Sequence, residues 1–492
     1  MELDQELGVS LREFFAAGLT EIRENGGRVS PGADISWEIR GAAEKPLLHL
    51  WAEQYNLTRR VLAITEHSEQ RLALAVERFG RSKPDRLEFL RVDFDRPARE
   101  RTRDEFCARF KRILSGQFPD ETLESLTTAP NLEHSLSGNY ARGISRSKSS
   151  SMAVLAVPES ETQDSIENSL TYGLLWLEHA RKSARSNAVA GLRLILPKGN
   201  IAAVAHRLAA LHPQIHVELF VHDPALETVE KMDPRDAGNI STWLVSCKER
   251  QSLFDQARPA LEPILALARK CISMHAGPHA REVILRFRGL TFARWKDGEI
   301  SVYVKESWVR TADSAESQLK KSVHHLETHR SPMSADSRHA LYRAQAERWL
   351  ESIVREDISR IDAALDGRFV YSQVFTEAGG EHGILDLLTV TRTGRLAILE
   401  LKATENIHLA IQGADYWLRI RRHLAQGDFS RYGYFPGIQL QATAPIVYLV
   451  APALRFHPAN DIILKYLTPE LEIIRVGLTE SWRRGMQVVM RQ

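Results

Sequence analysis

Apolar residues dominate two runs within residues 383–403, GILDLLTVTRTGRLAILELKA, and a short polar turn separates the runs. Side chains along a strand point to opposite faces with a period of two, so we examined each run as a β-strand. Both strands are apolar on both faces except at Asp386, Glu400 and Lys402. Strands of this composition are usually buried on both sides. The pattern therefore predicts a buried hairpin that carries charge.

The turn decides which residues of the two strands face each other. Gly394 suits the left-handed position that closes a three-residue loop, a type I turn followed by a glycine bulge. With that loop Asp386 lies opposite Glu400, with Cβ atoms about 4.5–5.5 Å apart. A two-residue loop would make them diagonal neighbours, still within reach of a shared ion. Two carboxylates this close repel unless a metal ion or a proton neutralises them, so we interpret the pair as a metal site with the Lys402 ammonium beside it.

A structural salt bridge is the alternative interpretation of these three residues. It needs only one carboxylate, whereas this strand face carries two, Asp386 and Glu400. An unpaired charge in such a strand costs several kcal/mol or shifts its pKa until it is neutral. The metal site is therefore the favoured hypothesis.

The remaining periodicity predicts a multidomain α/β protein. The C-terminal unit, 335–492, has the predicted order α-β-β-β-α-β-α-β, beginning with one helix over 339–365. Strands and helices alternate in the domain 150–275, which predicts a central parallel α/β layer. Residues 280–330 contain a predicted hairpin that turns at Lys296-Asp297-Gly298-Glu299, followed by a linker region. Residues 1–140 predict a mixed α+β N-terminal domain that opens with a helix over 10–27, and the Ser-, Gly- and Arg-rich stretch 137–151 predicts a loop or linker.

Composition narrows the class of protein. A chain of 492 residues suggests about three domains of roughly 150 residues each. It is 43% hydrophobic and 26% charged, as expected for a globular protein, and its net charge of +2 leaves only local patches for binding nucleic acid. Three scattered cysteines, an N-terminus unlike a signal peptide and the absence of a long apolar run predict a cytoplasmic protein that spans no membrane.

The C-terminal unit resembles the PD-(D/E)xK nuclease superfamily over about residues 335–492. The resemblance rests on the order of elements, on Asp386 and on Glu400-Leu401-Lys402, with Gln412 and Tyr416 on the following helix. The family also takes a glutamate from the first helix. Here that is Glu351, which we favour, or Glu347 one turn earlier. Residues 1–330 resemble no family that we recognise.

The resemblance implies the chemistry of the site. It implies that Mg²⁺ or Mn²⁺ is held by Asp386, Glu400, the Leu401 carbonyl and the helix glutamate. The metal would activate a water for attack on a phosphodiester. Lys402 would orient that water and stabilise the developing charge, and Gln412 would hold Lys402 or the water through a hydrogen bond. Gln412 and Tyr416 also fit an ordinary helix face with a satisfied polar residue.

Contacts to nucleic acid are predicted at a second set of residues. The hairpin of 282–304 carries basic side chains that can grip phosphates, although an ordinary charged sheet face has the same composition. A histidine where the strand enters the site and an aromatic on the following helix complete the set: Arg286, Arg288, Arg294, Lys296, His382 and Tyr416. The HHLETH segment, with His324, His325 and His329 at helical spacing, is more typical of a polar linker helix than of a metal site.

Three functions remain open from sequence. The first is a metal-dependent DNA endonuclease whose N-terminal domains recognise substrate or partner. The second is a non-catalytic nucleic-acid-binding or regulatory protein on a nuclease-like scaffold, and the third is a defence nuclease activated by a small nucleotide bound to its α/β domain. The expected partners are nucleic acid, DNA before RNA, and a second copy of the chain.

Overall fold

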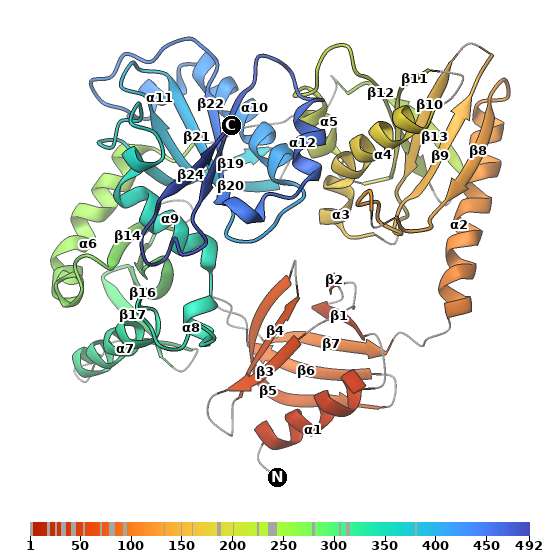
Figure 1. Ribbon diagram of the computed structural model, residues 1–492. Coiled ribbons are helices and arrows are strands. Elements are labelled where there is room, and N and C mark those ends of the chain that lie inside the picture. Colours follow the sequence, from red (N-terminus) through yellow and green to blue (C-terminus); the bar gives the residue numbers. More distant parts are fainter. Residues whose placement is uncertain are drawn as a thin grey trace. The chain divides into compact units, whose positions relative to one another are not determined.

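The computed structural model divides the chain into two compact units (Figure 1). The first comprises residues 1–104 with 302–309, and the second comprises residues 105–301 with 310–492. The structure describes the whole chain except residues 1–2, 17–19, 25–26, 31–35, 41–45, 53–54, 69–70, 78–83, 92–95, 132, 149, 160, 185–187, 200, 224–225, 235–243, 278–280, 305–306, 311–314 and 379–380.

The first unit is a seven-stranded antiparallel sheet in the order β2-β1-β7-β6-β5-β4-β3. Its helix α1 buries Leu7, Leu11 and Phe14 in the core of the sheet. The elements are α1 (Leu3–Ala16), β1 (Thr20–Glu24), β2 (Gly27–Ser30), β3 (Ser36–Arg40), β4 (Leu47–Ala52), β5 (Tyr55–His67), β6 (Arg71–Glu77) and β7 (Asp85–Arg91).

The second unit begins with an α/β sheet in the order β13-β12-β11-β10-β9-β8. Strands β10, β11 and β12 are parallel, which confirms the predicted parallel layer. Alternate side chains enter two cores, so Leu155 faces the helices α3 to α5 while Val154 faces α2. The elements are α2 (Arg96–Gln117), β8 (Thr122–Thr127), β9 (Ala141–Arg146), β10 (Ser151–Ala156), α3 (Gln163–Glu167), α4 (Ser169–Ser183), β11 (Val189–Pro197), α5 (Ala202–Leu208), β12 (His216–Asp223) and β13 (Thr228–Met232).

A third sheet runs in the order β14-β15-β16-β17-β18. The predicted turn between β16 and β17 is confirmed, since Asp297 and Gly298 have φ of +51° and +83°, as a hairpin turn of this kind requires. The elements of this region are α6 (Cys247–Leu267), β14 (Ile272–Ala276), β15 (Val283–Phe287), β16 (Leu290–Lys296), β17 (Glu299–Val304), β18 (Ser307–Arg310) and α7 (Ala315–His329).

The C-terminal sheet runs in the order β19-β20-β21-β22-β23-β24. Helix α9 packs on one of its faces through Trp349 and Leu350, and α10 packs on the other through Trp417 and Ile420. The elements are α8 (Ala340–Arg343), α9 (Ala346–Glu356), the 3-10 helix η2 (Ile358–Arg360), β19 (Tyr371–Ala378), β20 (Glu381–Val390), β21 (Leu396–Leu401), α10 (Leu409–Ala425), α11 (Asp428–Arg431), β22 (Ile446–Pro452), the 3-10 helix η3 (Ala453–Arg455), α12 (Ala459–Leu464), β23 (Glu472–Leu478) and β24 (Val488–Arg491).

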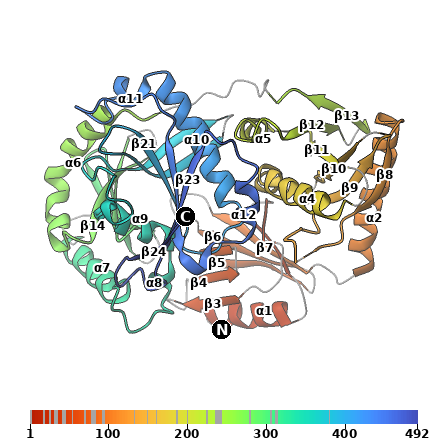
Figure 2. The same ribbon diagram turned by 45° about the horizontal axis from the view of Figure 1, so that its top comes forward.

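The helices between the α/β sheet and the C-terminal sheet join the two into one hydrophobic cluster (Figure 1, Figure 2). Helix α4 contacts α12, and α5 contacts α10. The backbone continues the connection, because Thr468 donates to the Ala210 carbonyl at 2.8 Å and His212 donates to the Tyr466 carbonyl at 2.8 Å. The catalytic candidates on α10 therefore share a core with the α/β layer.

Two predicted elements are wrong, and a third is interrupted. The helix expected over 10–27 ends at Ala16 and is followed by β1, which buries Ile22 against the sheet. The linker expected over 137–151 contains strand β9, whose buried Arg142 donates to the Ser137 carbonyl at 2.9 Å. The α/β sheet thus includes strands from Thr122 onward, before the predicted boundary.

The single helix expected over 339–365 is also interrupted. Gln345 has φ of +46° and separates α8 from α9. The buried guanidinium of Arg330 holds this break, because its Nη1 atom donates to the carbonyls of Leu341 and Ala344 at 2.6 Å each. The break sets the direction of α9, which carries both candidate glutamates.

Candidate active site

The central hairpin has the register that the sequence predicts. Strands β20 and β21 are antiparallel, and Leu387 faces Leu399. Gly394 has φ of +91°, and its amide donates to the Thr391 carbonyl at 2.9 Å. A Cβ atom at Gly394 would lie 2.3 Å from the Gln439 carbonyl oxygen, so only glycine fits there. The three-residue loop with a glycine bulge is confirmed.

The register brings the three charged residues of the hairpin together. Asp386 lies just beyond the last paired residues, and its Oδ2 accepts a hydrogen bond from the Leu401 amide at 2.9 Å. Lys402 Nζ donates to Glu400 Oε1 at 3.1 Å. The Glu400 residue is only 3% exposed and the Lys402 side chain is 11% exposed. The second oxygen of Glu400, Oε2, is buried and has no hydrogen-bond partner among the described residues.

Burial and mutual repulsion make this group of charges unusual. Burial raises the pKa of Asp386, and burial together with the charge of Asp386 raises the pKa of Glu400. Burial alone would lower the pKa of Lys402, but Glu400, Glu347 and Asp386 outweigh it and raise that pKa. Lys402 therefore stays protonated, while the two carboxyl groups resist ionising together. One ammonium does not fully compensate the pair.

Helix α9 supplies both glutamates that the sequence left open. Glu351 is 3% exposed, and its Oε2 accepts from Arg348 Nη1 at 3.0 Å. Burial raises the pKa of Glu351 from 4.5 to about 7, Arg348 opposes this rise, and the charge of Asp386 adds to it. Glu347, whose side chain is 44% exposed, has its Oε2 3.8 Å from Lys402 Nζ. Both glutamates thus lie beside the hairpin charges, and their roles stay predictions.

Helix α10 places the two other expected residues on the opposite side of the sheet from α9. The Oε1 atom of Gln412 is buried without a hydrogen-bond partner among the described residues. The Tyr416 hydroxyl donates to the Ile384 carbonyl at 3.1 Å, which attaches α10 to β20. Burial raises the pKa of Tyr416 well above its ordinary value, and the charges of Glu400 and Asp386 add to that rise. Contact of Tyr416 with nucleic acid stays a prediction.

These residues fit a hard divalent cation. Mg²⁺ and Mn²⁺ prefer oxygen ligands, and the site offers carboxylate oxygens from Asp386 and Glu400. Buried polar atoms in folded proteins are almost always hydrogen-bonded, so the two unpartnered oxygens, Glu400 Oε2 and Gln412 Oε1, are exceptions that need an explanation. A bound cation would satisfy the first of them directly and would relieve the repulsion between the two carboxylates.

The basic residues predicted on the third sheet have different surroundings. Arg286, on β15, is close enough to Glu351 to lower the pKa of that carboxyl, and burial lowers its own pKa to about 10. Arg288 follows the end of β15 and donates to the Arg330 carbonyl at 2.6 Å, a contact that packs α7. Arg294 lies 3.9 Å from the Glu282 carboxylate, and Lys296 is exposed at the end of β16. Phosphate binding by these residues stays a prediction.

The side chain of His382 lies outside the described part of the structure. Only its backbone position is known, as the partner of Glu377 in the pairing of β19 with β20.

Sequence reasoning missed a group of cations on α9 itself. Arg348 and Arg355 flank Glu351, and Arg355 Nη1 lies 3.4 Å from the Nε2 atom of His275 on β14. Burial lowers the pKa of His275, and the charges of Arg286, Arg355 and Arg348 lower it further. The signal was present in the sequence, because positions 348, 351 and 355 share one helix face.

Comparison with known proteins leaves the family of this chain open. No family model matches it, and no curated protein matches it. One similar solved structure is the crystal structure of a repair endonuclease from Pyrococcus abyssi, with 13% identity, covering 47% of this chain and 97% of that chain at a TM-score of 0.18. Another is Can2 from Sulfobacillus thermosulfidooxidans in complex with cyclic tetra-adenylate, with 9% identity, covering 65% of this chain and 86% of that chain at a TM-score of 0.15. Since both TM-scores are far below 0.5, function has to be argued from the residues themselves.

No helix in the described part of the chain has both the length and the apolar composition that crossing a membrane requires.

Proposed function

We propose that the chain is a metal-dependent nuclease that hydrolyses phosphodiester bonds in DNA, with its active site at the β20–β21 hairpin. One observation carries the proposal. The carboxylate of Glu400 is buried at a hairpin end beside Asp386 and the Lys402 ammonium, and its Oε2 atom has no partner among the described residues. A site that served only stability would not bury an uncompensated carboxylate, because that costs free energy.

Asp386, Glu400 and the Leu401 carbonyl would hold Mg²⁺ or Mn²⁺. When bound, the ion would supply Lewis-acid polarisation of a phosphoryl oxygen and would lower the pKa of a coordinated water. The hydrogen bond from the Leu401 amide at 2.9 Å orients the Asp386 carboxylate, so this ligand is fixed before an ion arrives.

Lys402 would stabilise the negative charge that develops on the phosphate during hydrolysis. Its ammonium is fixed 3.1 Å from Glu400 Oε1, and its raised pKa keeps it charged. Preorganised cations of this kind act without reorganising during the reaction, which makes their contribution large. Gln412 would orient the attacking water or Lys402 through its amide, and Glu351 or Glu347 would complete the shell.

The arginines on α9 and β15 would complement the substrate. Arg286, Arg348 and Arg355 form a cationic group beside Glu351, and a nucleic-acid backbone carries one negative charge per phosphate. A local group like this is needed, because the net charge of +2 supplies little long-range attraction.

The decisive experiment is a cleavage assay on linear, nicked, flapped, mismatched and single-stranded DNA with Mg²⁺ or Mn²⁺. We expect cleavage that EDTA abolishes and that Asp386→Asn removes. Lys402→Ala should lower turnover by about 10²–10³-fold while sparing metal binding, the loss typical of one missing electrostatic stabiliser. Lys402→Arg should rescue poorly, because a planar fork does not replace a compact ammonium.

Glu470→Gln is a suitable control for these variants. Its carboxylate pairs with Arg421 at 2.9 Å on an exposed surface, so its loss should leave cleavage unchanged. Cleavage that persists in EDTA, or no cleavage of any substrate with either ion, would count against the proposal. Cleavage of RNA but not of DNA would support the proposed nuclease activity and would show that the proposed substrate is wrong.

A second candidate, a nuclease switched on by a small nucleotide at the α/β layer, is favoured by one observation. The layer touches the start of α10 directly, since His408 Nδ1 lies 3.0 Å from the Thr171 hydroxyl. Arg207 of α5 also lies 3.7 Å from the Asp415 carboxylate on α10. Full cleavage by the purified chain without any added nucleotide would remove this candidate.

A further inference from the structure

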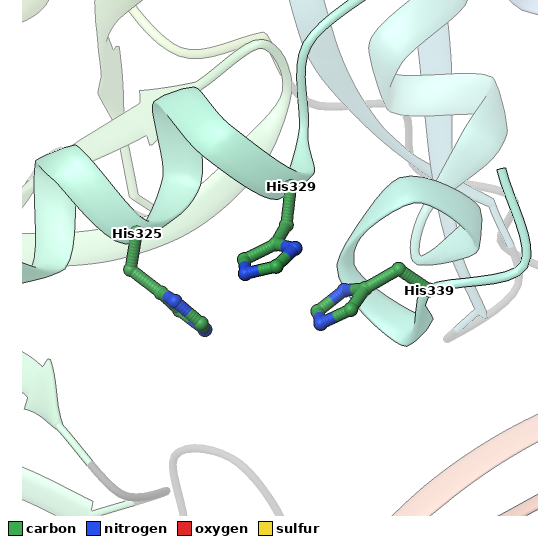
Figure 3. Close-up of side chains that lie close together, drawn as sticks. All are labelled: His325, His329 and His339. Carbon is green, nitrogen blue, oxygen red and sulfur yellow. The ribbon is translucent and has the colours of Figure 1, made fainter. Parts of the chain in front are cut away.

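Three histidine side chains converge between α7 and α8, away from the hairpin charges (Figure 3). One ring nitrogen from each histidine lies within 4.8 Å of the corresponding nitrogens of the other two. Two of the histidines come from the HHLETH segment, whose spacing is ordinary for a polar helix. The third lies ten residues further along the chain, so the sequence alone does not reveal the group, which comprises His325, His329 and His339.

The backbone that carries these rings is fixed by other contacts. His325 and His329 are one turn apart and share a face of α7. Arg330, the next residue, is fully buried and ties the end of α7 to α8 through the carbonyls of Leu341 and Ala344. His339 caps α8, with its Nδ1 accepting from the Leu341 amide at 3.2 Å. The fold therefore brings the backbone positions of the three histidines close together.

The arrangement of the rings suits neutral imidazoles. The rings of His329 and His339 stack with centroids 3.9 Å apart and planes 11° apart, and His325 lies 4.5 Å from His329. Protonated rings this close would repel each other. Neutral imidazole nitrogen is the form that binds transition metals.

We propose that His325, His329 and His339 form a Zn²⁺-binding site with three nitrogen ligands and a fourth position open to solvent. Imidazole nitrogen suits zinc and similar borderline metals, whereas Mg²⁺ and Mn²⁺ prefer oxygen. No carboxylate joins the three histidines within the cluster as described. This ion would therefore differ in kind from the one at Asp386 and Glu400, and the inference does not depend on nuclease activity.

Binding would require two small adjustments. Tetrahedral zinc with bonds of about 2.1 Å holds its nitrogen ligands about 3.4 Å apart, so the rings must close in and the stack of His329 and His339 must open. His339 must also give up its cap to the Leu341 amide. If Nδ1 binds zinc, its one lone pair is used; if Nε2 binds zinc, the proton of the neutral ring moves to Nδ1, which then no longer accepts. Side-chain rotations suffice, since Arg330 holds the backbone independently.

The place of the site in the fold suggests its effect. It would link the end of α7 to the start of α8 and so close the segment 330–338 between them. The same segment leads through Gln345 into α9, which carries Glu347 and Glu351. Zinc would therefore act on the stability of this connection, as structural zinc sites do.

The test uses the full-length chain with Asp386→Ala and Glu400→Ala, which remove the hairpin ligands, after stripping of metals. Titration with ZnCl₂ against a chromophoric chelator should give one bound ion per chain. His329→Ala and His325→Ala should each weaken binding by at least about 100-fold, since loss of an outer-shell partner alone costs roughly 10–100-fold. His325 is exposed, so its substitution should leave the fold intact.

His324→Ala is the matched control, because this exposed histidine lies on the same helix outside the cluster. It should bind zinc like the background protein. In a melting experiment zinc should raise the Tm of the background and of the His324 variant but not of the His325 or His329 variants, and Mg²⁺ should raise none of them. Absence of zinc binding in the background, or unchanged affinity in His325→Ala and His329→Ala, would overturn the proposal.

Discussion

Two groups of charges, one in the α/β sheet and one in the C-terminal sheet, are built in opposite ways. In the α/β sheet Arg193 of β11 is 4% exposed and binds Glu121 at 2.8 Å and Glu218 at 2.9 Å. Its guanidinium also lies 3.6 Å from the centroid of the Phe118 ring. In the C-terminal sheet Asp386 and Glu400 lie beside the cation Lys402, which is hydrogen-bonded to Glu400 at 3.1 Å.

The pKa values move in opposite directions in the two groups. The hydrogen bond from Arg193 lowers the pKa of Glu121, and Lys231 and Arg193 lower that of Glu218 against the effect of burial. At the hairpin burial raises the pKa of Glu400 and the neighbouring Asp386 raises it further. Both groups contain two acids near a cation. In the α/β sheet the cations outweigh the effect of burial on the carboxylates, whereas at the hairpin burial outweighs the effect of Lys402. Buried charge alone therefore does not carry the proposal of an active site, which rests on charge that is both buried and uncompensated.

The largest expected effect on stability is at the group around Arg193, in which the cation compensates the charges of Glu121 and Glu218. Arg193→Ala should lower the free energy of unfolding by about 3 kcal/mol, the lower end for a broken buried pair, because both carboxylates are partly exposed. Urea denaturation of the full chain measures this change. Adding Glu121→Gln and Glu218→Gln should recover much of the loss, since no uncompensated charge then remains. A loss below about 0.5 kcal/mol would mean that the two groups do not differ as described.

A smaller effect of opposite sign is expected at the hairpin. Glu400→Gln should raise the unfolding free energy of the metal-free chain by about 1 kcal/mol, because it removes one of two repelling charges. The same substitution should abolish the stabilisation that Mn²⁺ gives. Glu218→Gln is the matched comparison and should destabilise the chain, since it removes a partner of Arg193. If Glu400→Gln destabilised the metal-free chain as strongly, Glu400 and Lys402 would form a structural salt bridge.

The third effect is a change in pH dependence, which is small at any one pH step. Glu351 has a pKa of about 7 in the fold and 4.5 ordinarily, so the folded chain holds a proton that the unfolded chain releases. The resulting stabilisation is full below pH 4.5 and is lost as the pH rises through 7. Metal-free wild type should therefore lose stability between pH 4.5 and 7 more steeply than Glu351→Gln, by up to about 1 kcal/mol per pH unit. Parallel curves for the two proteins would show that Glu351 does not titrate in this range.

The comparison also explains which features the sequence predicts. The hairpin register depends on local chemistry, a period of two and one glycine, and is confirmed by the facing of Leu387 and Leu399. The parallel strands of the α/β layer follow from the alternation of strand and helix patterns and are confirmed as well. Both are properties of short stretches of chain.

Features that depend on distant residues were not predictable from such stretches. The helix break at Gln345 depends on Arg330, fifteen residues earlier, which donates to the carbonyl of Gln345 at 3.4 Å. Strand β9 has the composition of a loop, and it is buried because Arg142 finds its acceptors inside the fold. His339 likewise joins His325 and His329 only through the packing of α8.

The hydrophobic cluster shared by the α/β sheet and the C-terminal sheet limits how this chain can be divided. Leu170 and Leu177 on α4, and Ile463 on α12, belong to the same buried cluster as the core of α10. A fragment that began near residue 335 would expose this apolar surface and tend to aggregate. Recombination that joined either part to an unrelated domain would expose the same apolar surface. The candidate nuclease and its α/β neighbour should therefore be inherited as one block rather than exchanged as separate modules.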